Sequence, residues 1–388
     1  RLPQERMLKK LLQEGQARPE MLEAVARRVA LFHAEAETGG EIDRIGGIET
    51  IRRNHEENFD QTAPFVGRTI PPEQYRFIRA YALGFLERER ALFDRRVAHH
   101  RIRDCHGDLH LEHILVADDI LIFDCIEFND RFRYEDVAAE VAFLAMDLDF
   151  NGYAGEAERF VSAYIRSTGD DAIRTLLNFY KCYYAYVRGK VVGFRLDDNA
   201  IGASDREEAA RTAARYFDLA YTCAARLERP ALILVAGLMG TGKSVLARNL
   251  APRLGAEILR MDVLRKERLA LKPTDRNPED FGQGIYASDV SRETYAEALR
   301  RAEDLLAAGH AVIIDASYKR EDERRRAEAL ARRYGAAFHI LECLCPEAVI
   351  RRRLDARAAD AAEPSDGRWE IFEAQRADFD PLSGWALG

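Results

Sequence analysis

The chain has 388 residues, of which 47% are hydrophobic and 32% are charged, which is typical of a folded protein with more than one core. Its net charge of −8 argues against a general binder of nucleic acid or of membrane surfaces. No apolar run approaches the roughly 20 residues that a membrane-spanning helix needs. The acidic excess lies in residues 1–228, because residues 229–388 hold 26 basic and 26 acidic side chains.

The six cysteines do not form the pattern of a disulfide framework. Four of them are scattered, and Cys343 and Cys345 form a lone C-x-C without the second pair that a zinc site needs. We therefore predict buried thiols in a protein of the reducing cytoplasm.

Helical periodicity dominates the first part of the chain. Residues 1–38 and 72–98 place apolar side chains three and four positions apart, which predicts helices. The short β-type pieces HILVA and ILIFDCIEF flank residues 118–119, two aspartates that suit a hairpin turn. The helical pattern returns over residues 134–217.

The sequence HGDLHLEHILV, residues 106–116, resembles the catalytic loop of aminoglycoside phosphotransferases and choline-type kinases, written H-G-D-x-H-x-x-N. The resemblance implies that Asp108 accepts the proton of the acceptor hydroxyl, and that His106 and His110 fix the loop by hydrogen bonds. It also implies that Asp124, further along the chain, holds Mg²⁺ on the phosphates. The alternative is a histidine-rich turn that arose by chance.

Two departures from that family bear on activity. His113 stands where the family has asparagine, a magnesium ligand, and imidazole is a poor ligand for Mg²⁺. The family also has an N-terminal lobe with a nucleotide-covering loop and a lysine, whereas the residues before His106 have a helical pattern. We expect that a lobe of the same protein is missing from this chain, and that the first domain is inactive or nearly so.

An aromatic stretch within the helical region has two interpretations. Four aromatic side chains within residues 179–184 are spaced as helix neighbours, which predicts core packing. Arg188 and Lys190 follow them, and the alternative is that this face lines an acceptor pocket or meets the second domain.

The pattern changes at Pro230. Four apolar β-type runs alternate with amphipathic helical stretches, which predicts βαβ units, a parallel sheet and strands covered on both faces. These runs are residues 232–237, 256–262, 310–316 and 338–344. We predict an α/β protein overall, with a mainly helical kinase C-lobe-like domain (residues 1–228) followed by a three-layer P-loop α/β domain (residues 229–388).

The sequence GLMGTGKS, residues 237–244, fits the pattern G-x-x-x-x-G-K-S/T between a strand and a helix. Its glycines let backbone N–H groups surround phosphate oxygens at the positive end of the helix. Lys243 is predicted to reach the β- and γ-phosphates, and the Ser244 hydroxyl to bind Mg²⁺. The predicted nucleotide-binding residues are Gly237, Gly240, Thr241, Gly242, Lys243 and Ser244.

Polar residues at two further strand ends are candidates for the chemistry. Asp315 ends an apolar strand and is predicted to hold Mg²⁺ through water. Asp262 follows another strand and would accept the proton of an attacking hydroxyl, while Arg265 holds an anionic group or the transferring phosphoryl group. The alternatives are helix caps and a surface arginine.

An arginine-rich helical stretch, EAVIRRRLDARAAD (residues 347–360), runs into residues 356–367, which are predicted to form a mobile loop. Arg353 and Arg357 are four positions apart and share a helix face, and the arginine fork suits phosphate. Such a helix and loop predict a lid over ATP. The alternative is a solvated surface helix.

These later motifs resemble the P-loop kinases of small molecules, the gluconate-kinase, adenylylsulfate-kinase and zeta-toxin group. The order of the two domains resembles a bacterial family described as bifunctional aminoglycoside phosphotransferase/ATP-binding proteins. The resemblance implies transfer of phosphoryl from ATP, with Mg²⁺, to a hydroxyl of a small molecule, with Asp262 as base. The alternatives are a regulatory switch that binds or hydrolyses ATP without an acceptor, and a toxin-like nucleotide-sugar kinase.

Overall fold

The computed structural model divides into two compact units, residues 1–225 and 226–388, and each is described by itself. The predicted boundary between residues 228 and 229 lies close to this division. The structure describes residues 3–198, 200–227, 230–271, 284, 287–358 and 369–382.

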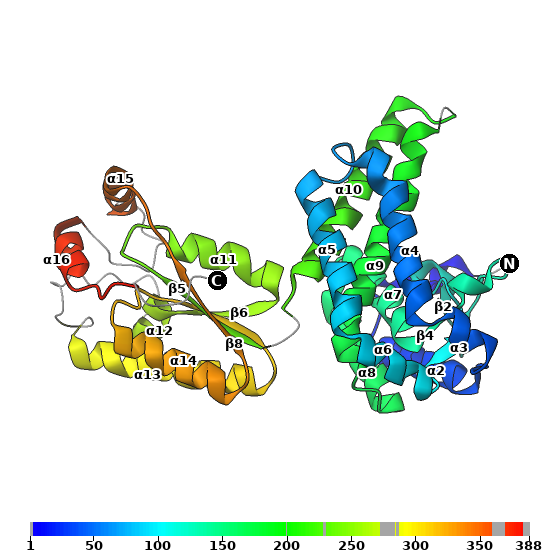
Figure 1. The fold of residues 1–388 in the computed structure, drawn as a ribbon, viewed down its shortest axis with the longest axis horizontal. Coiled ribbons are helices and arrows are strands. Elements are labelled where there is room, and N and C mark those ends of the chain that lie inside the picture. The colour runs from blue at the N-terminus through cyan, green and yellow to red at the C-terminus, as the bar shows by residue number, and fades with distance from the viewer. Residues whose placement is uncertain are drawn as a thin grey trace. The chain divides into compact units, whose positions relative to one another are not determined.

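The first unit is mainly helical (Figure 1). Pro19 and Pro72 open two of its longer helices, because proline suits the first helical turn, where its missing N–H is not needed. Its helices are α1 (Leu8–Gln13), α2 (Pro19–Glu35), α3 (Glu41–Ile45), α4 (Ile48–Thr62), α5 (Pro72–Arg88), α6 (Arg90–Ala98), α7 (Val137–Phe150), α8 (Ala154–Thr168), α9 (Ile173–Phe194) and α10 (Ala203–Ala225).

Two short antiparallel ladders lie beside these helices. The strands β2 (Ile114–Val116) and β3 (Ile120–Ile122) form the hairpin that the sequence predicts. The strands β1 (Ile102–Asp104) and β4 (Tyr134–Asp136) also pair, although β4 begins the region predicted to be helical. Three residues are too few to show a period, so this second ladder has no sequence signal.

The helix predicted over residues 72–98 is two helices. It breaks at Glu89, between α5 and α6, where the backbone leaves the helical region at φ −100° and ψ 15°. The change of direction lets α6 bury Leu92, Phe93 and Arg96 in the core.

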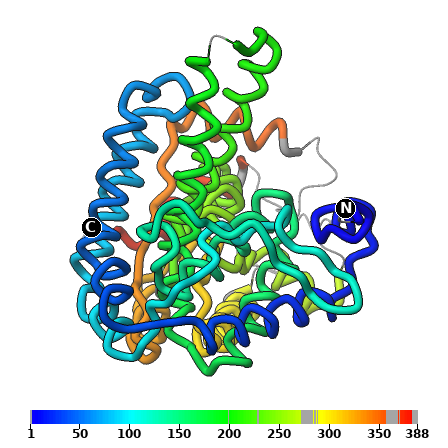
Figure 2. The backbone as a smooth tube through the Cα atoms, turned by 90° about the vertical axis from the view of Figure 1, so that its right-hand side faces the viewer, coloured from blue at the N-terminus to red at the C-terminus, as the bar shows by residue number. Residues whose placement is uncertain are grey.

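The core of the first unit is built around α7, whose residues 137–148 are all buried. Helices α9 and α10 form a long pair beside it (Figures 1 and 2). Phe179 on α9 stacks on Phe85 with ring centres 4.5 Å apart, and Tyr184 stacks on Phe143 at 4.2 Å. The aromatic stretch therefore packs in the core, as its spacing predicts.

The second unit holds a parallel four-stranded sheet in the order β6-β7-β5-β8. Alternate residues of β5 and β7 enter two separate apolar clusters, one with α13 and α14 and one with α11. Helices thus cover both faces of the sheet, which makes three layers (Figure 1). The elements are β5 (Ala231–Ala236), α11 (Lys243–Leu254), β6 (Ala256–Arg260), α12 (Met261–Arg268), α13 (Ser288–Ala307), β7 (Ala311–Asp315), α14 (Glu321–Arg333), β8 (Ala337–Glu342), α15 (Glu347–Ala358) and α16 (Phe372–Ala377).

The strands are not all covered equally. All residues of the inner strands β5 and β7 are buried, as predicted, but β6 and β8 are partly exposed. The prediction of strands covered on both faces was wrong for these two, because they are the outer strands of the sheet and have a neighbouring strand on one side alone.

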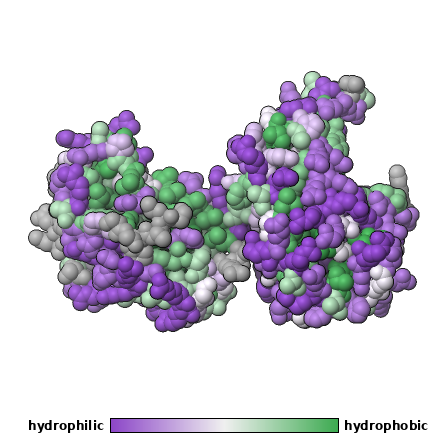
Figure 3. All heavy atoms as spheres, viewed as in Figure 1, coloured by the Kyte–Doolittle hydropathy of each residue, from purple (hydrophilic) through white to green (hydrophobic). Residues whose placement is uncertain are grey.

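The outward surface of α13 and α14 is largely hydrophilic (Figure 3). Several arginines of α14 pair with acidic side chains one turn away, for example Arg325 with Glu321 and Arg326 with Asp322. Within the described ranges, no helix combines the length and the apolar character needed to cross a membrane.

Candidate functional site

The turn between β5 and α11 adopts a backbone that glycine alone accepts easily. Gly237, Gly240 and Gly242 have φ values of 132°, 76° and 104°. A Cβ atom on Gly237 would lie 2.7 Å from the carbonyl oxygen of Cys343, which no side chain tolerates. The turn lies at the carboxyl end of the buried central strand, where parallel sheets bind ligands.

Side chains of the turn also hold it in shape. The Lys243 ammonium and the Thr241 hydroxyl both donate to the carbonyl oxygen of Leu238, at 2.9 and 2.8 Å. Helix α11 begins at Lys243, so the positive end of its dipole faces the turn. Such an arrangement of glycine turn and helix N-terminus suits an anion such as phosphate.

Asp315 lies at the end of β7, next to the turn, and is 6% exposed. Burial raises the pKa of its carboxyl group, while a hydrogen bond from Ser244 and the charge of Lys243 act in the opposite direction. The Arg260 Nε lies 3.7 Å from its Oδ2. The Ser244 hydroxyl and this carboxylate are hard oxygen donors, which fit Mg²⁺.

Asp262 lies in the first turn of α12, directly after β6. Its Oδ1 is 3.3 Å from Nη1 of the mostly buried Arg265. The negative charge of Asp262 helps to raise the pKa of Asp315. The structure therefore brings Lys243 and Ser244 together with Asp262 and Asp315 at one edge of the sheet.

Arg353 on α15 contacts the glycine turn. Its Nη1 donates to the carbonyl oxygens of Gly240 and Thr241, at 3.4 and 3.2 Å. The α15 backbone includes position 357, but the Arg357 side chain lies outside the described residues. The predicted mobile loop lies outside them from residue 359 onward.

Two contacts of the turn have no motif that would predict them. Arg260 faces Asp315 from the strand next to it. Gln375 on α16 accepts a hydrogen bond from the backbone N–H of Met239, at 2.8 Å. Arg260 lies inside the predicted β-type run 256–262, and the structure shows that it ends the strand. Nothing in the sequence relates Gln375 to the turn.

The first unit holds its HGD loop by histidine contacts. His106 donates from Nε2 to the Phe123 carbonyl oxygen at 2.8 Å, and its Nδ1 accepts from the N–H of Asp108 at 3.3 Å. Gly107 has a φ of 81°, and a Cβ atom there would lie 2.7 Å from the carbonyl oxygen of Phe132. The loop is thus fixed on both sides.

His113 lies between Asp108 of this loop and Asp124, which follows the β2–β3 hairpin. Its Nδ1 is 3.6 Å from Oδ2 of Asp108, and its Nε2 is 3.4 Å from Oδ2 of Asp124. Burial disfavours ionisation of Asp108, but its hydrogen bond with His110 and the charges of His110 and His113 outweigh this and lower its pKa. Asp108 is therefore held as a carboxylate, the form that accepts a proton.

The donors around Asp124 do not fit Mg²⁺. The neighbouring ligand is an imidazole, whereas Mg²⁺ demands hard oxygen atoms. The Asp124 side chain is 75% exposed and its backbone φ is 65°. No step of phosphoryl transfer is assigned to magnesium at this position.

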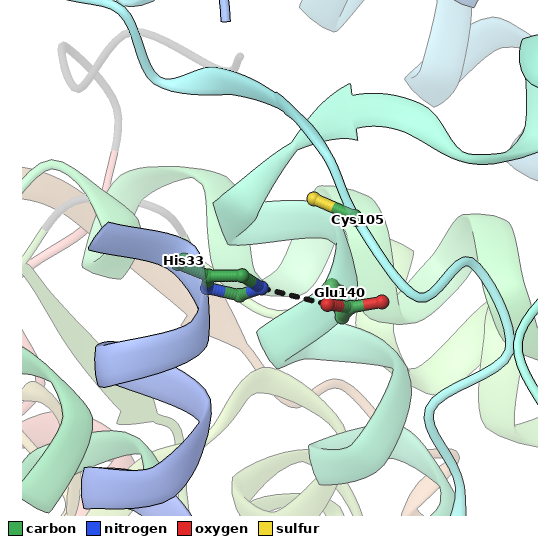
Figure 4. A group of neighbouring side chains, drawn as sticks. All are labelled: His33, Cys105 and Glu140. Carbon is green, nitrogen blue, oxygen red and sulfur yellow. Dashed lines mark hydrogen bonds and ion pairs between the residues drawn. The ribbon is translucent and has the colours of Figure 1, made fainter. Parts of the chain in front are cut away.

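A buried group behind the loop includes His33, Cys105 and Glu140 (Figure 4). Glu140 accepts from the N–H of Gly107 at 2.7 Å and pairs with Nε2 of His33 at 2.6 Å. The other ring nitrogen of His33 pairs with the Tyr164 hydroxyl. Because the histidine and the carboxylate already have protein partners, we interpret the group as a support for the HGD loop.

A cavity of about 430 Å³ opens beside Asp108. Its wall includes Tyr183, Glu135 and the two basic side chains Arg188 and Lys190. Burial raises the pKa of Glu135 well above its usual range, with the charge of Glu140 adding to it. The alternative that the aromatic helix also lines a pocket therefore agrees with the structure.

Sequence reasoning missed the carboxylates that hold the HGD loop. Glu140 binds Gly107, and Asp147 accepts from the N–H of Leu111 at 2.9 Å. Both lie in the mostly apolar α7, at buried positions. A charged residue within an apolar run needs a buried partner, and this signal was available in the sequence.

Two family models match this chain, one within each unit. The phosphotransferase enzyme family, APH, matches residues 2–176, and an AAA domain matches residues 232–382. The uncharacterized protein Rv2004c of Mycobacterium tuberculosis is 31% identical over 360 residues, which are 92% of this chain and 71% of that protein. The chain belongs to the family of this protein. It is an enzyme of the kinase or phosphotransferase type, with a phosphotransferase domain joined to a P-loop domain.

Two other similar proteins match a smaller part of this chain. The UPF0200 protein of Aeropyrum pernix is 32% identical over 149 residues, which are 38% of this chain and 73% of that protein. A gluconokinase from Sinorhizobium meliloti 1021 has 16% identity and a TM-score of 0.29, and covers 40% of this chain and 79% of its own.

Proposed function

We propose that this family member is an ATP-dependent kinase that moves the γ-phosphoryl group of ATP to a hydroxyl of a small molecule, with the nucleotide in the second unit. The observation that carries the proposal is the grouping of Lys243, Ser244, Asp262 and Asp315 around one glycine turn. The prediction of buried thiols holds for Cys105, Cys182 and Cys223 but not for the exposed Cys125. The cysteine pattern of the sequence supports the cytoplasm as the compartment that we propose.

The turn and α11 would bind the phosphates through backbone N–H groups. Lys243 would exchange its bond to the Leu238 carbonyl for the β- and γ-phosphate oxygens. Ser244 and Asp315 would hold Mg²⁺, which neutralises charge on the phosphates when bound.

The acceptor chemistry falls to two residues of α12. Asp262 would take the proton from the acceptor hydroxyl, oriented by Arg265 at 3.3 Å. Arg353 and Arg357 on α15 would contact the transferring phosphoryl group. These roles follow the geometry of P-loop phosphoryl transfer, in which positioning and charge supply most of the catalysis.

The first unit would contribute an acceptor surface or regulation. Asp108 has the ionisation state of a general base and a cavity beside it. The donors at Asp124 nevertheless do not fit the ion that the family uses. We therefore propose that its own transfer activity is impaired.

The alternative is a regulatory switch that binds or hydrolyses ATP without an acceptor. The contact of Arg353 with the glycine turn favours it, because nucleotide entering the turn would compete with this contact. Binding would then move α15 whether or not an acceptor is present.

Acceptor-dependent turnover tests the proposal. ADP release from Mg-ATP is measured with and without a panel of hydroxylated metabolites that includes nucleotide sugars. We expect one acceptor class to stimulate release, and Asp262→Asn to keep nucleotide binding but lose the stimulation by more than about 100-fold. The exposed Asp322→Asn is the control. Slow release indifferent to every acceptor would instead support the switch.

A further inference from the structure

The ring of His113 has a defined protonation pattern. Its Nδ1 lies 2.9 Å from the backbone carbonyl oxygen of Asp108. A carbonyl oxygen accepts and never donates, so Nδ1 carries the proton of this hydrogen bond. In the neutral ring, Nε2 then presents an electron pair to Oδ2 of Asp124, 3.4 Å away. The two electron pairs repel each other unless a cation lies between them, either a proton on the ring or a bound metal ion.

The spacing of these two atoms matches the ligands of a tetrahedral metal ion. Zinc-type ions bind imidazole nitrogen and carboxylate oxygen at about 2.0 to 2.2 Å, which places two such ligands roughly 3.4 Å apart at a tetrahedral angle. The separation of Nε2 of His113 and Oδ2 of Asp124 is 3.4 Å. An octahedral magnesium site would bring adjacent ligands to about 3.0 Å and would not use the nitrogen.

His110 orients the neighbouring carboxylate. Its Nδ1 accepts the N–H of Glu112 at 3.3 Å, so its Nε2 carries a proton. This Nε2 lies 3.5 Å from Oδ2 of Asp108. Asp108 therefore adds negative charge beside His113 and Asp124. His110 orients the Asp108 carboxylate, as hydrogen-bond partners around metal sites do.

We propose that the first unit binds a divalent transition-metal ion of the cobalt and zinc class between His113 Nε2 and Asp124, in preference to Mg²⁺. Imidazole suits these ions, and their affinity for mixed nitrogen and oxygen sites exceeds that of harder ions. The site needs nothing from the second unit and does not depend on the proposed kinase activity.

Cobalt titration of the full chain without nucleotide tests the site. Co²⁺ bound by imidazole and carboxylate absorbs visible light, and this signal does not require activity. We expect His113→Asn and Asp124→Asn each to weaken Co²⁺ binding by at least about tenfold, because loss of even an outer-shell partner weakens binding by about that much. A large excess of Mg²⁺ should leave the wild-type signal in place.

Two controls make the outcome decisive. His100→Asn makes the same substitution at an exposed histidine with a φ of 55°, which asparagine tolerates, and should leave the signal unchanged. Circular dichroism checks the folding of each variant. If His113→Asn does not fold, the Co²⁺ affinity of Asp124→Asn, a substitution at an exposed position, decides the outcome. Equal Co²⁺ binding by the wild type and the folded variants, no signal at all, or ready displacement by Mg²⁺ would overturn the proposal. A proton would then bridge the two side chains.

Discussion

Arg96 lies inside the first unit with its guanidinium between two buried carboxylates. Its Nε is 2.8 Å from Oδ2 of Asp136, and its Nη1 is 2.6 Å from Oδ1 of Asp170. Burial alone would lower the pKa of Arg96, but the two carboxylates outweigh it and raise the pKa. Asp136 also caps α7 by accepting from the N–H of Ala138. The pair of Arg96 and Asp136 therefore links α6 to α7, the helix that carries Glu140.

Arg96→Met should destabilise the first unit severely. The substitution leaves Asp136 and Asp170 buried without their partner, which typically costs about 3 to 5 kcal/mol. Urea unfolding, followed at the transition of the first unit, measures the loss. The exposed Arg95→Met on the same helix should change stability by less than about 0.5 kcal/mol. Equal effects of the two substitutions would show that the buried pair contributes little.

Glu323 gives the second unit a distinctive pH dependence. Burial, with help from Asp322, raises the pKa of its carboxyl group to about 7, although Lys319 and Tyr295 act against the shift. Because the folded-state pKa lies above the unfolded value of about 4.5, its contribution to stability is complete below that value and is lost as the pH rises to about 7.

Glu323→Gln should remove this dependence. The variant keeps the shape of the side chain but cannot ionise, so its stability relative to wild type should increase between pH 4.5 and 7. Thermal unfolding across that range measures the difference. Glu321→Gln, an exposed position on the same helix, should follow the wild-type curve. A difference that shrinks as the pH rises would mean that the carboxyl group is not shifted upward.

At the scale of elements, the sequence predicted correctly those structures whose parts follow one another along the chain. The strand, glycine turn and helix around Lys243 follow one another in the sequence, so the motif predicted them together. The hairpin of β2 and β3 had the same advantage. The pairing of β1 with β4 brings together segments about 30 residues apart, and each strand is too short to show alternation.

The same reasoning separates the predicted from the unpredicted parts of the candidate sites. Asp262 and Asp315 were predicted to lie together because Asp262 follows one strand and Asp315 ends another strand of the same sheet, whose carboxyl ends meet. Glu140 and Gln375 contact their loops from distant helices, and only the fold brings them there. The roles of the predicted side chains stay predictions until they are tested.

Arg353 provides the test at this scale. Its contact with Gly240 and Thr241 connects α15 to the glycine turn. Arg353→Ala should lower turnover at saturating ATP by at least about tenfold, because an arginine on the transferring phosphoryl group commonly contributes more than that. The exposed neighbour Arg352→Ala is the matched control. Steady-state kinetics that cannot distinguish the two would reduce α15 to a surface helix.

The whole molecule combines two domains that are each of a phosphoryl-transfer type, in the order that its family shares. We propose different tasks for them. The glycine turn of the second unit has three glycines with positive φ, a lysine and hard oxygen donors, which together suit the phosphates of a nucleotide. The HGD loop of the first unit has a base and a cavity, but an imidazole where a magnesium ligand is expected.

Equilibrium binding of a non-hydrolysable ATP analogue to the full chain tests this division most directly. We predict that Lys243→Ala lowers the affinity by more than about 100-fold, since the lysine and the turn supply most contacts to the phosphates. Asp108→Asn should bind like the wild type. Loss of binding in Asp108→Asn, with Lys243→Ala unaffected and both variants folded, would place the nucleotide in the first unit and contradict the account.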